Sequence, residues 1–124
     1  MKQNVHKAMK IYVAGKLNAD AILYIMNLHR MIKTAESVRK LGCAVFVPGL
    51  DFLMGMMFGD WNYEDYFNNS QPWLAVADAV FVGADWQTSV GTKREIETAE
   101  SLGIPIFYNL KLLEQWLEVQ SHNM

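Results

Sequence analysis

Residues 79–108, AVFVGADWQTSVGTKREIETAESLGIPIFY, contain the pattern that decides the fold. Two short apolar runs, AVFV at 79–82 and IPIFY at 104–108, enclose a polar turn and a helical pattern over 91–102. Neither run alternates apolar with polar residues, which is typical of strands that are covered on both faces in a parallel sheet. Gly103 follows the helical pattern and predicts its end. The segment therefore predicts a strand–helix–strand unit with a right-handed crossover.

Two further apolar runs, IYVA at 11–14 and AVFV at 44–47, repeat this unit toward the N-terminus. Between them, apolar residues recur with a period close to 3.6 from Ala21 to Leu41, which predicts a helix. Asn18 or Asp20 is a candidate cap for the start of this helix, and a glycine follows its end.

The amphipathic segment LKLLEQWLEVQ at 110–120 predicts a last helix, so strands and helices alternate along the chain. This order predicts an α/β fold: a small doubly wound three-layer sandwich, flavodoxin-like or Rossmann-like, with a mainly parallel sheet of about four or five strands. We expect the strand order 2-1-3-4, with helices on both faces of the sheet.

The central segment 48–78, PGLDFLMGMMFGDWNYEDYFNNSQPWLAVAD, is long for a single connection. Its first half, LMGMMFG, is apolar but interrupted by glycines, so we expect no regular helix there. We interpret it as a buried loop or a dimer contact, or alternatively as a lid against a flat aromatic ligand. The second half predicts a helix up to Asn69, with Pro72 opening or bending the next turn.

The chain has 124 residues, and we expect one domain over residues 1–124, with residues 1–9 as an N-terminal tail. A formal net charge of −2 and the lack of a basic run argue against a nucleic-acid polymer as partner. The chain has one cysteine and no His/Cys cluster with metal-ligand spacing, so we expect neither a disulfide nor a metal. No apolar run reaches the ~20 residues of a membrane span. We expect a cytoplasmic protein without a cofactor.

Two loops define the candidate site. Ligands of doubly wound sheets bind beyond the carboxyl ends of the strands, where the strand order reverses. The polar, glycine-containing loops AGKLNAD at 14–20 and GADWQTSVGT at 83–92 meet there. Both lead into helix N-termini, whose free N–H groups and positive dipole end attract anions. The sequence contains neither the glycine fingerprint of NAD-binding proteins nor that of P-loop proteins, which disfavours both ligand classes.

Glu95 has two interpretations. Thr92 and Glu95 match the capping box T-x-x-E, in which both side chains satisfy backbone donors at a helix start. The alternative is a nucleophile, because a carboxylate in a first helical turn is kept ionised by the dipole and can attack the anomeric carbon of a sugar. Ser89 and the backbone of Gly91 are then positioned to hold a phosphate or a sugar hydroxyl beside it.

The stretches KIYVAGKL, ADAVFV and SVGTKREIETAESLGIPI resemble the nucleoside 2-deoxyribosyltransferase superfamily, which includes the 2′-deoxynucleoside 5′-phosphate N-hydrolases. The resemblance covers about residues 10–108. It implies cleavage or transfer at the N-glycosidic bond of a 2′-deoxynucleoside or its 5′-monophosphate, through a covalent deoxyribosyl-glutamate intermediate. The implied partner is a small nucleoside or nucleotide.

The resemblance also assigns the site residues. It implies that Glu95 is the nucleophile, that Tyr12 is the tyrosine of the first strand, and that Ser89 holds the 5′-phosphate. The implied catalytic residues are Glu95 and Tyr12. The implied substrate-binding residues are Gly15, Lys16, Asn18, Ser70, Ser89 and Gly91.

One position departs from the family pattern. The family usually carries an aspartate eight residues before the aspartate of the ADAV motif, where it handles the proton of the nucleobase. Here that position is Ser70, eight residues before Asp78. Serine is not a general acid near neutral pH. Three alternatives stay open. An acid from the preceding turn reaches the base, with Asp60, Glu64 and Asp65 as candidates. Otherwise another group assists the departure of the base, or the activity is slow or lost.

Two other classes of function stay open: a nucleotide-binding protein with a weak or inactive site, and a structural or partner-binding protein on the same fold. Phosphoribohydrolases resembling lysine decarboxylases share G-T-x-x-E but also have a double glycine that this chain lacks, so they rank lower. We expect a homodimer or higher homo-oligomer, because exposed apolar stripes in small proteins commonly pair. The candidate interface residues are Trp61, Tyr63, Tyr66, Phe67 and Trp73.

Overall fold

The computed structural model describes residues 8–17 and 21–122, and within them four parallel strands form one sheet. The strand order β2-β1-β3-β4 is the one predicted. The strands are β1 (Lys10–Ala14), β2 (Ala44–Phe46), β3 (Ala79–Val82) and β4 (Ile106–Phe107). All of β3, and all of β1 except Lys10, is buried, which confirms that these apolar runs form strands covered on both faces.

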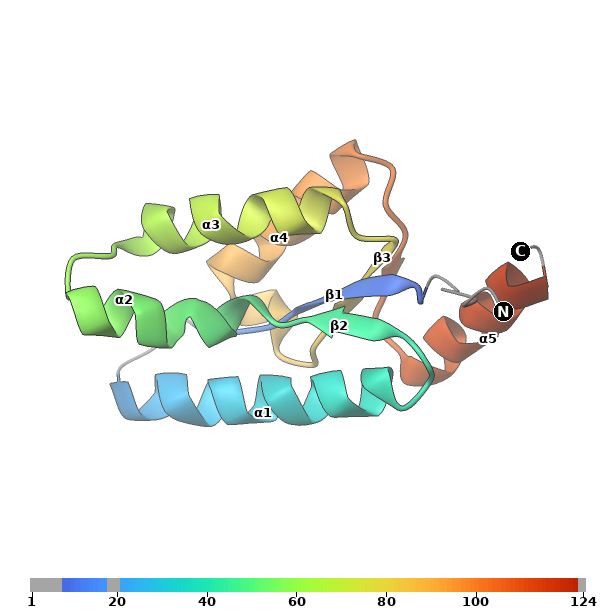
Figure 1. Ribbon diagram of the computed structural model, residues 1–124, viewed down its shortest axis with the longest axis horizontal. Coiled ribbons are helices and arrows are strands. Elements are labelled where there is room, and N and C mark those ends of the chain that lie inside the picture. Colours follow the sequence, from blue (N-terminus) through green and yellow to red (C-terminus); the bar gives the residue numbers. More distant parts are fainter. Residues whose placement is uncertain (1–7, 18–20, 123–124) are drawn as a thin grey trace, which may run out of the picture.

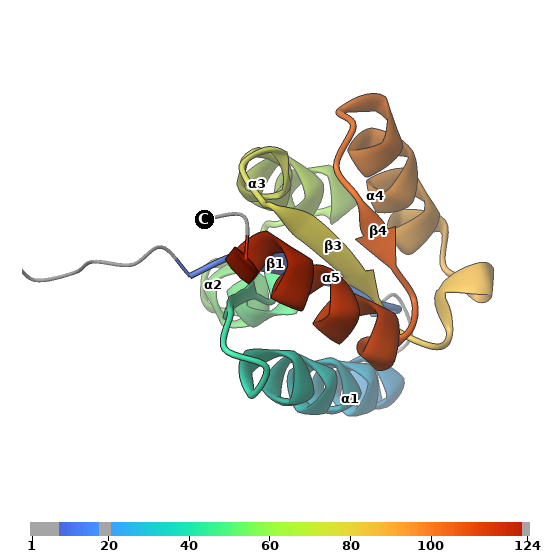
Figure 2. The same cartoon turned by 90° about the vertical axis from the view of Figure 1, so that its right-hand side faces the viewer.

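Helices cover both faces of the sheet and give the molecule three layers (Figures 1 and 2). These helices are α1 (Ala21–Arg39), α3 (Tyr63–Ala75), α4 (Val90–Ser101) and α5 (Leu110–His122). On one face, Tyr12 of β1 packs in a cluster with Ile96 of α4. On the other face, Ile11 packs with Val38 of α1 and Leu113 of α5. The architecture is therefore the predicted doubly wound, flavodoxin-like α/β sandwich.

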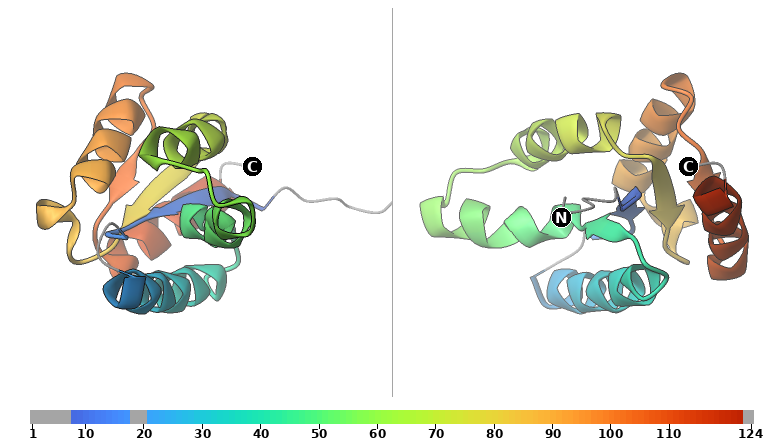
Figure 3. Two further views of the ribbon diagram at one scale, coloured as in Figure 1. Left: turned by 90° about the vertical axis from the view of Figure 1, so that its left-hand side faces the viewer. Right: turned by 45° about the vertical axis from the view of Figure 1, so that its right-hand side comes forward.

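Helix α2 (Phe52–Phe58) extends beyond the carboxyl end of β2, between α1 and α3 (Figures 1 and 3). The expectation of no regular helix in this segment is wrong. Helix α3 packs closely against α2 at Gly55, where a Cβ would lie 1.9 Å from Tyr66 Oη. Glycine is needed inside α2 because any larger residue would overlap Tyr66. Gly59 ends the helix in the left-handed conformation, with φ of 76°. The two glycines thus allow close packing and helix termination rather than preventing a helix.

Helix α3 runs unbroken from Tyr63 to Ala75, so the prediction that it ends at Asn69 is wrong. The helix begins with a capping box between Asn62 and Asp65, in which each side chain accepts a hydrogen bond from the other residue's backbone N–H. Pro72 lies inside the helix. Its missing N–H leaves the carbonyl of Asn68 without a helical partner, which is tolerated because Asn68 is exposed to water.

Hydrogen bonds at the amino end of the sheet hold β1 to its neighbours. Lys10 N donates to Asp78 Oδ2 at 2.7 Å, and Asp78 N donates to Lys10 O at 2.8 Å. Met9 belongs to the predicted N-terminal tail, but its carbonyl accepts a hydrogen bond from Ala44 N at 2.9 Å. Across residues 8–17 and 21–122, no helix is long and apolar enough to cross a membrane.

Candidate active site

A cavity of about 240 Å³ lies at the carboxyl ends of the strands, where the strand order predicts a ligand. This volume is a little below the roughly 300–1,000 Å³ of pockets for drug-sized ligands, so the cavity suits a small molecule. Its wall combines polar side chains with aromatic rings. The polar residues that carry the following argument are Asp51, Ser70, Ser89 and Glu95.

Four of the five aromatic residues that are candidates for an interface, from Trp61 to Phe67, line this cavity. The ring of Trp61 lies 5.0 Å from that of Tyr66, and Tyr63 stacks on Phe67 at 6.2 Å. The guanidinium of Arg94 lies over the Phe67 ring at 3.6 Å, which joins α4 to α3. The expectation that all of these rings are exposed is wrong, since Phe67 is buried.

Glu95 and Tyr12 form the central hydrogen bond of the site. Tyr12 lies in β1, one of the two central strands, and is fully buried. Glu95 on α4 is half-buried and lines the cavity. Tyr12 Oη donates to Glu95 Oε2. One carboxylate oxygen is thereby fixed by the sheet, and the side chain of Glu95 is held facing the cavity. The two predicted catalytic residues are thus in direct contact.

Burial controls the protonation of this pair. It raises the pKa of Glu95 from 4.5 to about 7, and the hydrogen bond from Tyr12 lowers the pKa in part. Burial also raises the pKa of Tyr12 well above its ordinary value, and the neighbouring Glu95 charge adds to this effect. Tyr12 therefore remains a neutral donor, while Glu95 titrates near neutral pH.

The helix dipole does not act on Glu95 as the sequence suggested. Helix α4 begins at Val90, so Glu95 lies in its second turn, beyond the range in which the dipole is strong. The capping-box interpretation is also wrong, because Ser89 is the cap and its Oγ accepts from Thr92 N at 3.1 Å. Thr92 Oγ1 donates to the same oxygen at 2.8 Å. Since neither contact uses Glu95, its carboxylate is left to face Tyr12 and the cavity.

Gly15, Ser89 and Gly91 all line the cavity, as their predicted role requires. Gly15 directly follows β1. Ser89 is the N-cap of α4, and Gly91 lies in its first turn. A Cβ on Gly91 would lie 3.4 Å from Tyr63 Oη, so a larger residue would narrow the space between α3 and α4. Binding of substrate by these residues stays a prediction.

Ser70 also lines the cavity, from α3, and is buried. Its hydroxyl donates to the carbonyl of Phe67 at 3.3 Å and interacts with Tyr12. The candidate replacement acids lie elsewhere. Asp65 is engaged in the α3 capping box, and Glu64 pairs with Arg94 at 2.9 Å. In the part of the chain that the structure describes, neither these two residues nor Asp60 lines the cavity.

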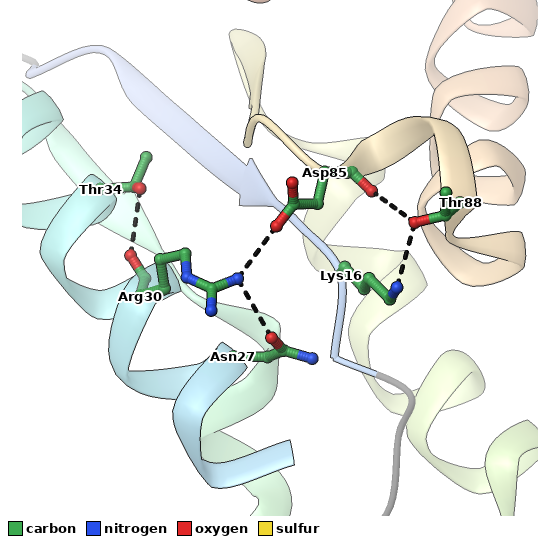
Figure 4. A network of polar contacts seen from close by, with 6 residues as sticks. All are labelled: Lys16, Asn27, Arg30, Thr34, Asp85 and Thr88. Atoms are coloured by element: carbon green, nitrogen blue, oxygen red, sulfur yellow. Dashed lines mark hydrogen bonds and ion pairs between the residues drawn. The ribbon is translucent and has the colours of Figure 1, made fainter. Parts of the chain in front are cut away.

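Lys16 lines a second, smaller hollow of about 40 Å³, which shares Gly15 with the main cavity. Its Nζ donates to Thr88 Oγ1 at 3.0 Å, as Figure 4 shows. The structure therefore does not bring Lys16 into the cavity that contains Glu95. Asn18, the other polar residue predicted in this loop, lies outside the described residues.

Asp51 is the cavity residue that the sequence interpretation missed. It ends the 3₁₀ helix Pro48–Asp51, which directly follows β2, and it lines the same cavity as Glu95. Asn69 Nδ2 donates to Asp51 Oδ2 at 3.3 Å. Burial raises the pKa of Asp51, and the contact with Asn69 lowers it in part. The available signal was the PGLD loop after β2, because this loop belongs to the same rim of the sheet as the two loops considered.

No group of three His, Cys, Asp or Glu side chains within the described ranges is arranged to hold a metal ion. A family model described as Domain of unknown function (DUF4406) matches residues 9–108. The chain belongs to this family. No protein of curated function matches the sequence significantly.

The solved structures that resemble this DUF4406 chain include the following two. The first is 2-deoxyribosyltransferase from Bacillus psychrosaccharolyticus, described as a biocatalyst for nucleoside synthesis, with a TM-score of 0.60 and 28% sequence identity. The match covers 78% of this chain and 69% of that enzyme, and it confirms the resemblance seen in the sequence. The second is a conserved protein from Enterococcus faecalis V583, with a TM-score of 0.57 and 18% identity. It covers 80% of this chain and 61% of the other, and it shows the fold alone.

Proposed function

We propose that this protein cleaves or transfers the N-glycosidic bond of a 2′-deoxynucleoside, with Glu95 as the nucleophile. The observation that carries this proposal is the carboxylate of Glu95, which faces a small cavity and is fixed through Oε2 by Tyr12. A carboxylate in this arrangement can form an ester with a sugar carbon. The likeness to a 2-deoxyribosyltransferase supports deoxyribose as that sugar.

The proposed reaction has two steps. Glu95 attacks C1′ through Oε1, the oxygen that Tyr12 does not engage, and the C1′–N bond breaks as its electron pair moves to the base. Water or a second base then attacks C1′ and releases Glu95. The raised pKa of Glu95 makes its carboxylate a stronger nucleophile once ionised, since basicity and nucleophilicity rise together.

The charge around the cavity favours a free nucleoside over its monophosphate. Among the described residues, the lining includes the carboxyl groups of Asp51 and Glu95 but no lysine, arginine or histidine. The Glu95 carboxylate would repel a phosphate, which would depend on Ser89 and the amino end of α4 alone. Aromatic rings such as Trp61 and Tyr66 offer surfaces on which an uncharged nucleobase can stack.

Release of free base from the four 2′-deoxynucleosides and their 5′-monophosphates, measured by chromatography, tests the proposal. We expect release from at least one deoxynucleoside, at a higher kcat/KM than from its monophosphate. Glu95→Gln should abolish release, whereas Glu97→Gln, an exposed glutamate on the same helix, should not. Full activity of the Glu95 variant would overturn the nucleophile assignment.

A catalytically weak or inactive nucleoside-binding protein is the second candidate. The observation that favours it is Ser70, which places a hydroxyl beside Tyr12 where the related enzymes usually have a carboxyl group. This candidate predicts that deoxynucleosides raise the melting temperature without release of base. Ser70→Asp would then be expected to create activity that the unmodified chain lacks.

We propose self-association through α2, whose sequence LMGMMFG was already a candidate dimer contact. The exposed apolar side chains of α2 are Leu53, Met54, Met56, Met57 and Phe58. Contiguous exposed apolar surface on a small protein marks an interaction site. Light scattering after size exclusion should give the mass of a dimer or larger assembly, and Met57→Glu should shift it to the monomer.

A further inference from the structure

We propose that Asp51 donates the proton to the departing base, the role for which Ser70 has no suitable group. This inference rests on the function proposed above. It assigns the leaving-group side of the reaction to a residue from a different part of the chain, in the 3₁₀ helix after β2.

Asp51 lies in the position that this role requires. Asp51 and Glu95 line one cavity from different elements, the segment after β2 and helix α4. Both carboxyl groups lie close enough to Tyr12, in the strand between those elements, to raise the pKa of its hydroxyl when they are ionised. A substrate whose sugar carbon meets Glu95 can therefore present its base to Asp51 within the same cavity.

Asp51 lacks the structural role its location suggests. It stands at the N-cap position of α2, where an aspartate normally accepts hydrogen bonds from the first backbone N–H groups. In this protein the Asp51 side chain makes no capping hydrogen bond. Its carboxyl group accepts a hydrogen bond from Asn69 of α3 instead. Helix capping therefore does not explain an aspartate at this site.

Partial burial raises the pKa of Asp51 and so favours its protonated form. The hydrogen bonds from Asn69 to Oδ2 and from the backbone of Asp51 lower this pKa in part. We place the proton on Oδ1, the oxygen that Asn69 does not contact. A nucleobase that fills the aromatic end of the cavity would remove more water from Asp51 and favour protonation further.

Glu95 Oε1 forms a bond with C1′ while the C1′–N bond breaks, and the base takes the proton from Asp51 Oδ1 at a ring nitrogen. In the second half, water adds to C1′, its proton passes to the Asp51 carboxylate, and the C1′–O bond to Glu95 breaks. Both carboxyl groups then return to their starting states, so no further reactant is required beyond water.

The test compares two leaving groups. Asp51→Asn should lower kcat/KM, which reports the step in which the leaving group departs, by roughly 100-fold or more for the best natural deoxynucleoside, within the range of general acid catalysis. It should lower kcat/KM for 4-nitrophenyl 2-deoxyribofuranoside by less than about 5-fold, because nitrophenolate departs without a proton. Asp51→Glu should recover part of the lost activity, and Asp60→Asn, at an exposed aspartate between α2 and α3, should leave both rates unchanged.

The outcomes separate the two proposals. Equal losses on both substrates in a folded Asp51→Asn variant, verified by its melting temperature, would overturn the role of Asp51 and leave Glu95 as nucleophile. If Asp51→Asn does not fold, equal losses of kcat/KM on both substrates in Asp51→Glu would have the same meaning. No release from either substrate by the unmodified protein would overturn the proposed function itself.

Discussion

The cavity has two walls that are built in different ways. On one side, α4 supplies Ser89, Gly91 and Glu95 from a single short stretch of sequence. On the other side, Asp51 and Tyr66 come from separate elements that meet through the packing of α2 against α3. The first wall is a local motif attached to the sheet. The second depends on tertiary contacts, so substitutions far from the proposed chemistry should disturb it more easily.

The largest effect on stability is expected at Gly55. Gly55→Ala should destabilise the protein by about 3 kcal/mol, because its Cβ would overlap the end of the Tyr66 ring and the packed helices would have to shift. Ligand affinity should fall as well, since Tyr66 lines the cavity. Urea unfolding measures the change, and Met56→Ala on the exposed face of α2 is the control. Wild-type stability of Gly55→Ala would show that the two helices are not tightly packed.

On the α4 wall, the stability of the protein should depend on pH through Glu95. Its pKa is about 7 in the folded protein, against an ordinary value of 4.5. The folded state therefore binds more protons than the unfolded state between these values. The resulting stabilisation is complete below about pH 4.5 and is lost as the pH rises through about 7.

Glu95→Gln removes this dependence. We expect the variant to exceed the unmodified protein by about 2 kcal/mol in stability at about pH 8 and to match it at about pH 4.5. Thermal unfolding at the two pH values tests this, with Glu97→Gln as the control on the same helix. A difference between variant and unmodified protein that does not change with pH would contradict the raised pKa.

Tyr12→Phe should have an intermediate effect, seen in catalysis. Loss of its hydrogen bond to Glu95 should lower kcat/KM by roughly 10-fold at neutral pH, the cost of one hydrogen bond to a charged group. Because that bond lowers the pKa of Glu95, the acidic limb of the kcat/KM profile should move to higher pH. An unchanged pH profile would mean that Tyr12 does not act on the nucleophile.

The smallest effect is expected at the cap of α4. Ser89→Ala should cost about 1 kcal/mol of stability, because it removes the acceptor for Thr92 N. Ser89→Asp keeps an acceptor at this position and should retain more of that stability. Denaturant unfolding of both variants compares them, and equal losses would show that the cap contributes little.

The two central strands could be predicted from the sequence because burial on both faces leaves continuous apolar runs, such as 79–82. The edge strands β2 and β4 also have apolar runs, although they are only partly buried. The alternation of strands and helices indicated a doubly wound sheet, and the structure confirms the expected order 2-1-3-4. Glu95 was found through its motif, but its environment was not. Sequence position suggested an anion held by the helix dipole, whereas burial between α4 and the sheet gives it a raised pKa.

The α2 wall was harder to predict, because its features depend on contacts between segments. Gly55 predicts a helix break when taken alone, and only the approach of Tyr66 explains why glycine lies inside α2. Asp51 lies in an ordinary turn sequence, and its importance emerges only when α3 brings Asn69 beside it. Lys16 shows the opposite case, since a cation in a candidate loop faces a different hollow.

Mass analysis of the protein quenched during reaction with a deoxynucleoside tests the central claim most directly. We predict an increase in intact mass equal to one deoxyribosyl group, located by peptide mapping to Glu95 and absent from Glu95→Gln. Attachment to another residue, or release of base by Glu95→Gln at the unmodified rate, would contradict the account.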